Sequence, residues 1–142
     1  MGRVELPNNG GEVRIIAGDY NDVHGPAHTF TPIHLFDIQF KANGKAQFEL
    51  PSSFNTAALV LRGSATINGT HAAKEGQFIL FGNTPGEILI EGHTDDTLVI
   101  VLSGEPIDEP VFQHGPFVMN SREEIIEAFQ DFQAGKMGTT EF

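Results

Sequence analysis

The feature that most constrains the fold is a series of short apolar segments separated by turn residues. Most segments run for about five to seven residues, and several alternate apolar and polar side chains as half-buried strands do. Asn43-Gly44 and Asn68-Gly69 are dipeptides typical of type I′ hairpin turns. The pattern therefore predicts an all-β domain built as a sandwich or a barrel.

The N-terminal residues 1–12 are polar and rich in Asn and Gly, and we expect them to form a flexible leader. A chain of 142 residues suits a single core, so we expect one domain over 13–142. The strands predicted within it cover 13–18, 33–40, 46–50, 57–61, 65–67, 70–72, 77–81, 87–91 and 97–103.

A helical pattern replaces the strand pattern near the C-terminus. Ser121 and Glu124 form a capping box, which predicts a helix over about 121–134. Ile125, Phe129 and Phe132 share one face of this helix. That apolar face would either cover one end of the barrel or dock on a partner.

Composition excludes several classes of function. Nineteen acidic residues against eight basic ones give a formal net charge of −11, with no basic cluster, which disfavours direct nucleic-acid binding. There is no cysteine, so disulfides and thiol catalysis are excluded. The longest apolar run, 98–102, is too short to cross a bilayer, and we expect a soluble, cytoplasmic protein with no membrane partner.

Five motifs follow one another along the chain: IIAGDYN (15–21), SGEPIDEPV (103–111), GPFVMNSREEI (115–125), AFQDF (128–132) and GKMG (135–138). In this order they resemble the C-terminal cupin domain of the pirin family, and the resemblance covers nearly the whole chain from Val13 onward. It implies a cupin-type double-stranded β-helix, which is a jelly-roll barrel, with one C-terminal α-helix.

Pirins usually contain two cupins, and this sequence resembles the second cupin and the segment that joins the two. In the family the first cupin holds iron through three histidines and a glutamate. It is linked to quercetin dioxygenase activity in some members and to transcriptional co-regulation in others. The resemblance therefore implies no cofactor for this chain, which would be a short relative or a cloned fragment; Met1-Gly2 and Glu141-Phe142 favour a fragment.

The segment 59–63, Leu-Val-Leu-Arg-Gly, resembles the corner that follows the metal-binding strand of catalytic cupins. Counting back to the family's H-x-H-x-x-x-E positions reaches Leu50, Ser52 and Thr56. Leucine cannot ligate a metal, and neutral hydroxyls are poor ligands for a mid-row divalent ion. No histidine lies in 76–91. We therefore expect the barrel to have lost its metal site.

The six histidines offer one substitute for that site. His24, His28 and His34 lie close in sequence, but their spacing fixes no common face, so surface positions for His24 and His28 are favoured over a metal cluster. His34 shares its strand parity with Phe36, which favours a hydrogen-bonded core histidine. We expect the other three at the surface: His71, His93 and His114.

A small apolar ligand pocket would remain where the metal site was, lined by Leu50, Ser52 and Thr56 with His34 or Gln77 nearby. The favoured alternative is an interior filled by aromatic side chains. The candidates for filling it are Phe30, Phe36, Phe40, Phe48, Phe54, Phe78 and Phe81.

Two classes of function follow. The favoured one is a non-catalytic, metal-free binding or dimerisation module whose partner is a second copy or an N-terminal pirin cupin. Its interface candidates are Phe36, Phe117, Ile125, Phe129 and Phe132. The alternative is part of a quercetinase-like dioxygenase whose metal lies in a separate cupin or at His24, His28 and His34; only the resemblance supports it. A protein-contact transcriptional co-regulator is a third reading without residue-level support.

Overall fold

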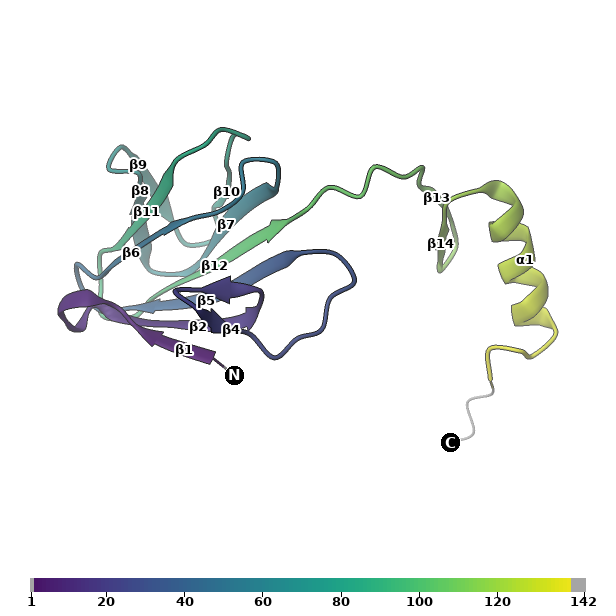
Figure 1. Ribbon diagram of the computed structural model, residues 1–142, viewed down its shortest axis with the longest axis horizontal. Coiled ribbons are helices and arrows are strands. Elements are labelled where there is room, and N and C mark those ends of the chain that lie inside the picture. The colour runs from purple at the N-terminus through teal and green to yellow at the C-terminus, as the bar shows by residue number, and fades with distance from the viewer. Residues whose placement is uncertain (1, 139–142) are drawn as a thin grey trace. The chain divides into compact units, whose positions relative to one another are not determined.

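The computed structural model describes residues 2–138, which form two compact units that divide after Pro106. The first, which we call the barrel unit, holds strands β1 to β12 (Figure 1). The second, the C-terminal unit, holds two strands and one helix. This division falls within the single domain expected over 13–142. Among residues 2–138, no helix has the length and apolar character needed to cross a membrane.

The larger sheet of the barrel unit has six antiparallel strands. Their order is β1 (Gly2–Glu5), β2 (Gly11–Ala17), β5 (Ile33–Phe40), β12 (Thr97–Gly104), β7 (Asn55–Arg62) and β10 (Phe78–Leu80). β12 lies between β5 and β7, so strands far apart in the sequence form the centre of the sheet. β1 belongs to the segment expected to be a flexible leader; instead it pairs with β2 from Gly2 to Glu5.

The second sheet has four antiparallel strands in the order β6 (Lys45–Glu49), β11 (Glu87–Gly92), β8 (Ser64–Ile67) and β9 (His71–Lys74). A short ribbon of β3 (Asp19–Tyr20) and β4 (Val23–His24) and a 3-10 turn, Pro7–Asn9, complete the unit. Asn68 and Gly69 both have positive φ and join β8 to β9, which confirms that hairpin. Asn43-Gly44 instead carries the chain from the larger sheet to the smaller one.

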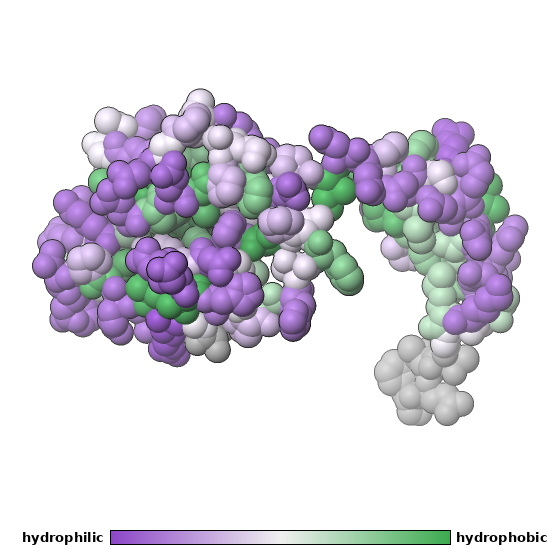
Figure 2. All heavy atoms as spheres, viewed as in Figure 1, coloured by the Kyte–Doolittle hydropathy of each residue, from purple (hydrophilic) through white to green (hydrophobic). Residues whose placement is uncertain are grey.

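The core lies between the two sheets. Alternate residues of β2, β5, β7 and β12 point inward, and most of them are buried, as the period-2 pattern requires. The largest fully buried side chains are Phe36, Phe40, Ile15, Ile38, Ile67, Ile90, Val13, Val60, Val99 and Val101. Phe30 and Phe78 were expected inside, but both are exposed: Phe30 lies in the segment before β5, and in β10 it is Ile79 and not Phe78 that packs on the core. Hydrophilic residues cover most of the visible surface of the unit (Figure 2).

The C-terminal unit is a hairpin of β13 (Phe112–His114) and β14 (Phe117–Met119) packed on α1 (Arg122–Gln133). The predicted N-cap forms, since the Glu124 N–H donates to Ser121 Oγ at 3.2 Å; the Glu124 carboxylate reaches back one residue further and accepts from the Asn120 N–H at 3.1 Å. Phe129 meets Phe117 edge-on, with ring centroids 5.0 Å apart. The helix therefore buries part of its apolar face against a hairpin that the sequence analysis did not predict.

Candidate binding site at the barrel mouth

Three strands bring polar side chains together at one end of the barrel interior, which we call the barrel mouth (His34, Thr56 and Ser103). The strand registers pair Ser103 of β12 with His34 of β5 and with Thr56 of β7, so the three side chains share one face. Thr56 and Ser103 are buried, and their hydroxyl oxygens hydrogen-bond at 2.7 Å. Each hydroxyl has the other as its partner, and neither supplies the charged oxygen that a hard divalent cation prefers.

The imidazole ring of His34 is oriented by the backbone beside it. The Asp19 N–H donates a hydrogen bond to His34 Nδ1 at 3.2 Å. A backbone N–H can only donate, so Nδ1 is the acceptor, and the neutral ring carries its proton on Nε2. Phe36 and Phe54 flank the ring at centroid distances of 5.8 and 5.9 Å. His34 therefore offers an N–H donor at the barrel mouth.

Gly18 permits this close approach. Its φ is +73°, and a Cβ added there would lie 2.4 Å from His34 Nδ1 and 2.5 Å from the Ile33 carbonyl oxygen. Both the left-handed backbone and the absence of a side chain are needed. The Asp19 N–H that follows reaches His34 for this reason.

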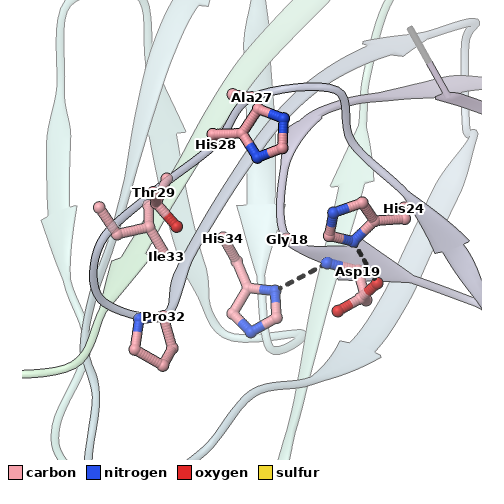
Figure 3. A pocket seen from close by; sticks show the side chains of 9 residues that line it. All are labelled: Gly18, Asp19, His24, Ala27, His28, Thr29, Pro32, Ile33 and His34. Atoms are coloured by element: carbon pink, nitrogen blue, oxygen red, sulfur yellow. Dashed lines mark hydrogen bonds and ion pairs between the residues drawn. The ribbon is translucent and has the colours of Figure 1, made fainter.

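A pocket of about 250 Å³ lies beside His34 (Figure 3). Its lining is Gly18, Asp19, His24, Ala27, His28, Thr29, Pro32, Ile33 and His34. His24 Nδ1 lies 2.8 Å from Asp19 Oδ1, and both side chains are largely exposed. The loop geometry thus brings the three histidines weighed as a substitute cluster to one pocket, which their spacing alone could not establish.

These three histidines do not form a metal-ligand set. Across residues 2–138, no three side chains from His, Asp or Glu are grouped so that they could hold a metal ion. His34 uses its Nδ1 to accept from the Asp19 N–H, so coordination of a metal through Nε2 would require it to give up that hydrogen bond. The pocket is therefore equipped to hydrogen-bond a polar group.

Aromatic rings fill the barrel interior behind the mouth. Tyr20 meets Phe36 edge-on at a centroid distance of 5.4 Å, and Phe48 lies 5.9 Å from both of those rings. These distances are those of packed aromatic pairs. Tyr20 was not among the residues expected to fill the core, because it lies after the strand predicted over 13–18 and was assigned to no element.

Comparison with known proteins identifies the family. The model of the pirin C-terminal cupin domain matches residues 35–138. The chain belongs to the pirin family. The identity is 42% over 134 residues to a Pseudomonas aeruginosa protein with the provisional name quercetin 2,3-dioxygenase, and 35% over 136 residues to Pirin-1 of Arabidopsis thaliana. The cupin-type fold with one C-terminal helix, expected from the resemblance, is confirmed.

A solved structure of quercetin 2,3-dioxygenase from Acinetobacter baumannii superposes on this pirin domain with a TM-score of 0.88 and 33% identity, covering 97% of this chain and 48% of that one. The alignments to the P. aeruginosa and A. thaliana relatives cover 94% and 92% of this chain but 46% and 47% of those proteins. This chain therefore spans about half the length of the curated relatives it matches.

The remaining predicted pocket residues of this pirin domain lie in different environments. Leu50 is partly buried and packs against the core, and Ser52 is partly exposed. Gln77 is exposed, and its side-chain oxygen accepts from the Lys74 N–H at 2.8 Å, so it does not line the interior as expected. Ser103 was missed, although its parity with the buried Val99 and Val101 marks it as inward-facing.

The predicted interface residues also differ in how far they are buried. Phe36 is fully buried inside the barrel and cannot contact a partner, because its position on β5 faces the core. Ile125 is buried, and Phe117 and Phe129 pack on each other within the C-terminal unit. Phe132 alone of the five is well exposed, at 63%.

Tyr20 provides a test of the packed interior, since it is the only tyrosine and the chain has no tryptophan. Burial raises the pKa of Tyr20 above its ordinary value of 10.0, because desolvation disfavours the phenolate. A raised folded-state pKa means that Tyr20 contributes stability below the unfolded pKa and loses it as pH rises through the folded one. We expect the absorbance of tyrosinate to titrate above pH 10.0 in the folded protein and at about 10 in urea.

Substitution of Tyr20 with Phe separates the loss of stability caused by ionisation of Tyr20 from other effects of high pH. Y20F should remove the part of the stability loss that coincides with the phenolate titration. If tyrosinate absorbance had its titration midpoint in the folded protein at or below the midpoint in the unfolded chain, the buried position of Tyr20 would be contradicted.

Proposed function

We propose that this pirin domain is a non-catalytic, metal-independent cupin module that acts by binding another protein domain. The observation that carries the proposal is the donor set at the barrel mouth. The hydroxyls of Thr56 and Ser103 bond to each other, and His34 spends its Nδ1 on the Asp19 N–H. These groups do not fit the iron centre of three histidines and a glutamate that the family resemblance assigns to the other cupin.

A second observation supports binding to protein. The outward face of the six-stranded sheet carries large apolar side chains at positions where a solvent-facing sheet normally carries polar ones. A cupin with a packed interior and an apolar outer face on one sheet is suited to assembly with another domain.

The test is metal content together with oxygenase activity. The desalted protein, after incubation with iron, nickel, copper or manganese, is expected to retain far less than one ion per chain by elemental analysis, and to consume no oxygen with quercetin. Because the donor groups are paired internally, H34A should leave both results unchanged. Stoichiometric retention that H34A or H24A abolishes would contradict the proposal.

A second candidate function is half of a metal-dependent dioxygenase whose metal lies in another cupin. The P. aeruginosa relative and the A. baumannii structure, which are about twice as long and carry the name quercetin 2,3-dioxygenase, favour it. This alternative expects quercetin oxidation only when the chain is co-purified with a metal-bearing N-terminal cupin, such as that half of the P. aeruginosa relative. Equal activity of that half alone would remove the support.

A further inference from the structure

The outer face of the larger sheet is apolar across four adjacent strands. Residues in register on β5, β12, β7 and β10 point to the same side, and we call the resulting surface the apolar face. It consists of Ile33, Leu35, Ala57, Leu59, Leu61, Phe78, Leu80, Leu98, Ile100 and Leu102. Phe78 is 61% exposed and Leu80 73%. With an apolar core on its other side, this half of the sheet is apolar on both faces, a pattern typical of strands covered on both sides.

The centre of the apolar face contains a hollow beside a protrusion. One cross-strand row reads Leu35, Leu102, Ala57, Leu80, so the small Ala57 lies between two leucines. A groove of about 400 Å³ includes this row; all four residues line it, together with residues toward the barrel mouth such as Ile33, Asn55 and Gly104. Leu102 forms one side of the groove and is 41% exposed.

We propose that the occupant of the apolar face is a second copy of this chain, related by a two-fold axis that runs along the strands between β12 and β7. This inference rests on the assembly function proposed above and names its partner. Rotation about this axis places each cross-strand row opposite the same row of the second copy, with the order of the strands reversed. Leu102 then enters the hollow over Ala57 of the second copy, and the reverse contact forms at the same time, as an isologous interface requires.

The charged border of the face fits the same axis. Arg14 of β2 and Asp37 of β5 form an ion pair in register with Phe78, in the row Arg14, Asp37, Ile100, Leu59, Phe78. The axis maps β10 onto β5, so Phe78 of the second copy lies opposite Asp37 and one strand from Arg14, whose guanidinium attracts an aromatic ring within its reach. The more distant β1 and β2 carry the Arg3–Glu12 pair and form a polar rim.

The size of the face suits a weak but specific dimer. The exposed parts of its large side chains amount to roughly 500 Å² per copy, or about 1,000 Å² for a pair, which is where specific interfaces begin. A net charge of −11 on each chain opposes association over the whole molecule. Because salt screens that repulsion and does not weaken apolar contact, we expect the dimer to tighten as ionic strength rises.

The experiment measures the mass of the full chain by light scattering across a dilution series up to roughly 100 µM, at low and high salt. We expect a dimer that L102D weakens by about 30-fold or more, since a charge would replace the central contact. The matched control is I126D, which places the same charge at an exposed apolar residue of α1 (58% exposed) and should leave the dimer intact. A monomer throughout the series, or dissociation by I126D but not by L102D, would overturn the proposal.

Cross-linking tests the position of the axis independently of any effect of L102D on folding. The chain has no cysteine, so L102C carries a single thiol. Stacked sheets lie about 10 Å apart, and a short bis-maleimide should therefore join two copies of L102C. Q47C, on the outer face of the smaller sheet, should stay uncross-linked; equal cross-linking of both would overturn the assignment.

A monomer that still lacks metal would contradict only this inference, whereas a dimer with stoichiometric metal would contradict only the proposed function.

Discussion

Replacing Phe36 with Ala is expected to lower the free energy of unfolding by about 3–5 kcal/mol. Phe36 is fully buried and contacts Tyr20, Phe48 and His34, so its removal leaves a cavity bounded by three rings. The measurement is urea unfolding followed by circular dichroism near neutral pH, where Tyr20 is protonated.

The control for this prediction is Phe30, a phenylalanine of the same chain that makes no buried contact and is fully exposed. F30A should change the free energy of unfolding by no more than about 0.5 kcal/mol. Similar losses for F36A and F30A would show that the barrel interior is not packed around Phe36.

Replacing Gly18 with Ala is expected to cost about 2–4 kcal/mol, the combined effect of a positive φ and of overpacking. The new Cβ would lie 2.4 Å from His34 Nδ1 and 2.5 Å from the Ile33 carbonyl oxygen, so the Asp19–His34 hydrogen bond must lengthen. Denaturant unfolding measures the loss. The nitrogen chemical shifts of the His34 ring report whether Nδ1 still accepts a hydrogen bond.

Gly69 is the matched control for Gly18, because its φ of +70° is similar and a Cβ there would meet nothing within 4 Å. G69A should cost only the backbone strain, about 1 kcal/mol, and leave the His34 shifts unchanged. If G18A cost no more than G69A, the close packing of Gly18 on His34 would be refuted.

The fold could be predicted well where local pattern and burial agree. The strand predicted over 33–40 is β5, and 97–103 corresponds to β12 with one further residue, because both strands have strong apolar alternation or continuous apolar character. The capping box likewise located the start of α1. These signals depend only on neighbouring residues.

The candidate site was harder to predict because it depends on contacts between distant segments. The orientation of His34 comes from the Asp19 N–H and from Gly18, which belong to another part of the chain. Ser103 joins the barrel mouth only through the register of β12 with β5 and β7. β1 was missed because its segment is mostly polar and alternate residues are exposed. Its strand conformation comes from the pairing with β2, which the composition of the segment does not indicate.

The apolar character of Ala57 to Leu61 was visible in the sequence, but its meaning was not. A continuous apolar run is consistent with a strand buried on both faces or with a buried helical segment. Only the register with β12 and β10 shows that alternate residues of this run contribute to one outward surface.

The central position of β12 also bears on how the chain is made. β5 and β7 leave the ribosome long before Thr97, and each must wait for β12 before its open edge is paired. Until then a nascent chain carries two unpaired, apolar strand edges, which are sites for association with other chains. Sheet closure is therefore a late event with a high contact order. Synthesis of this domain depends on keeping the open edges of β5 and β7 from pairing with other chains until β12 is made.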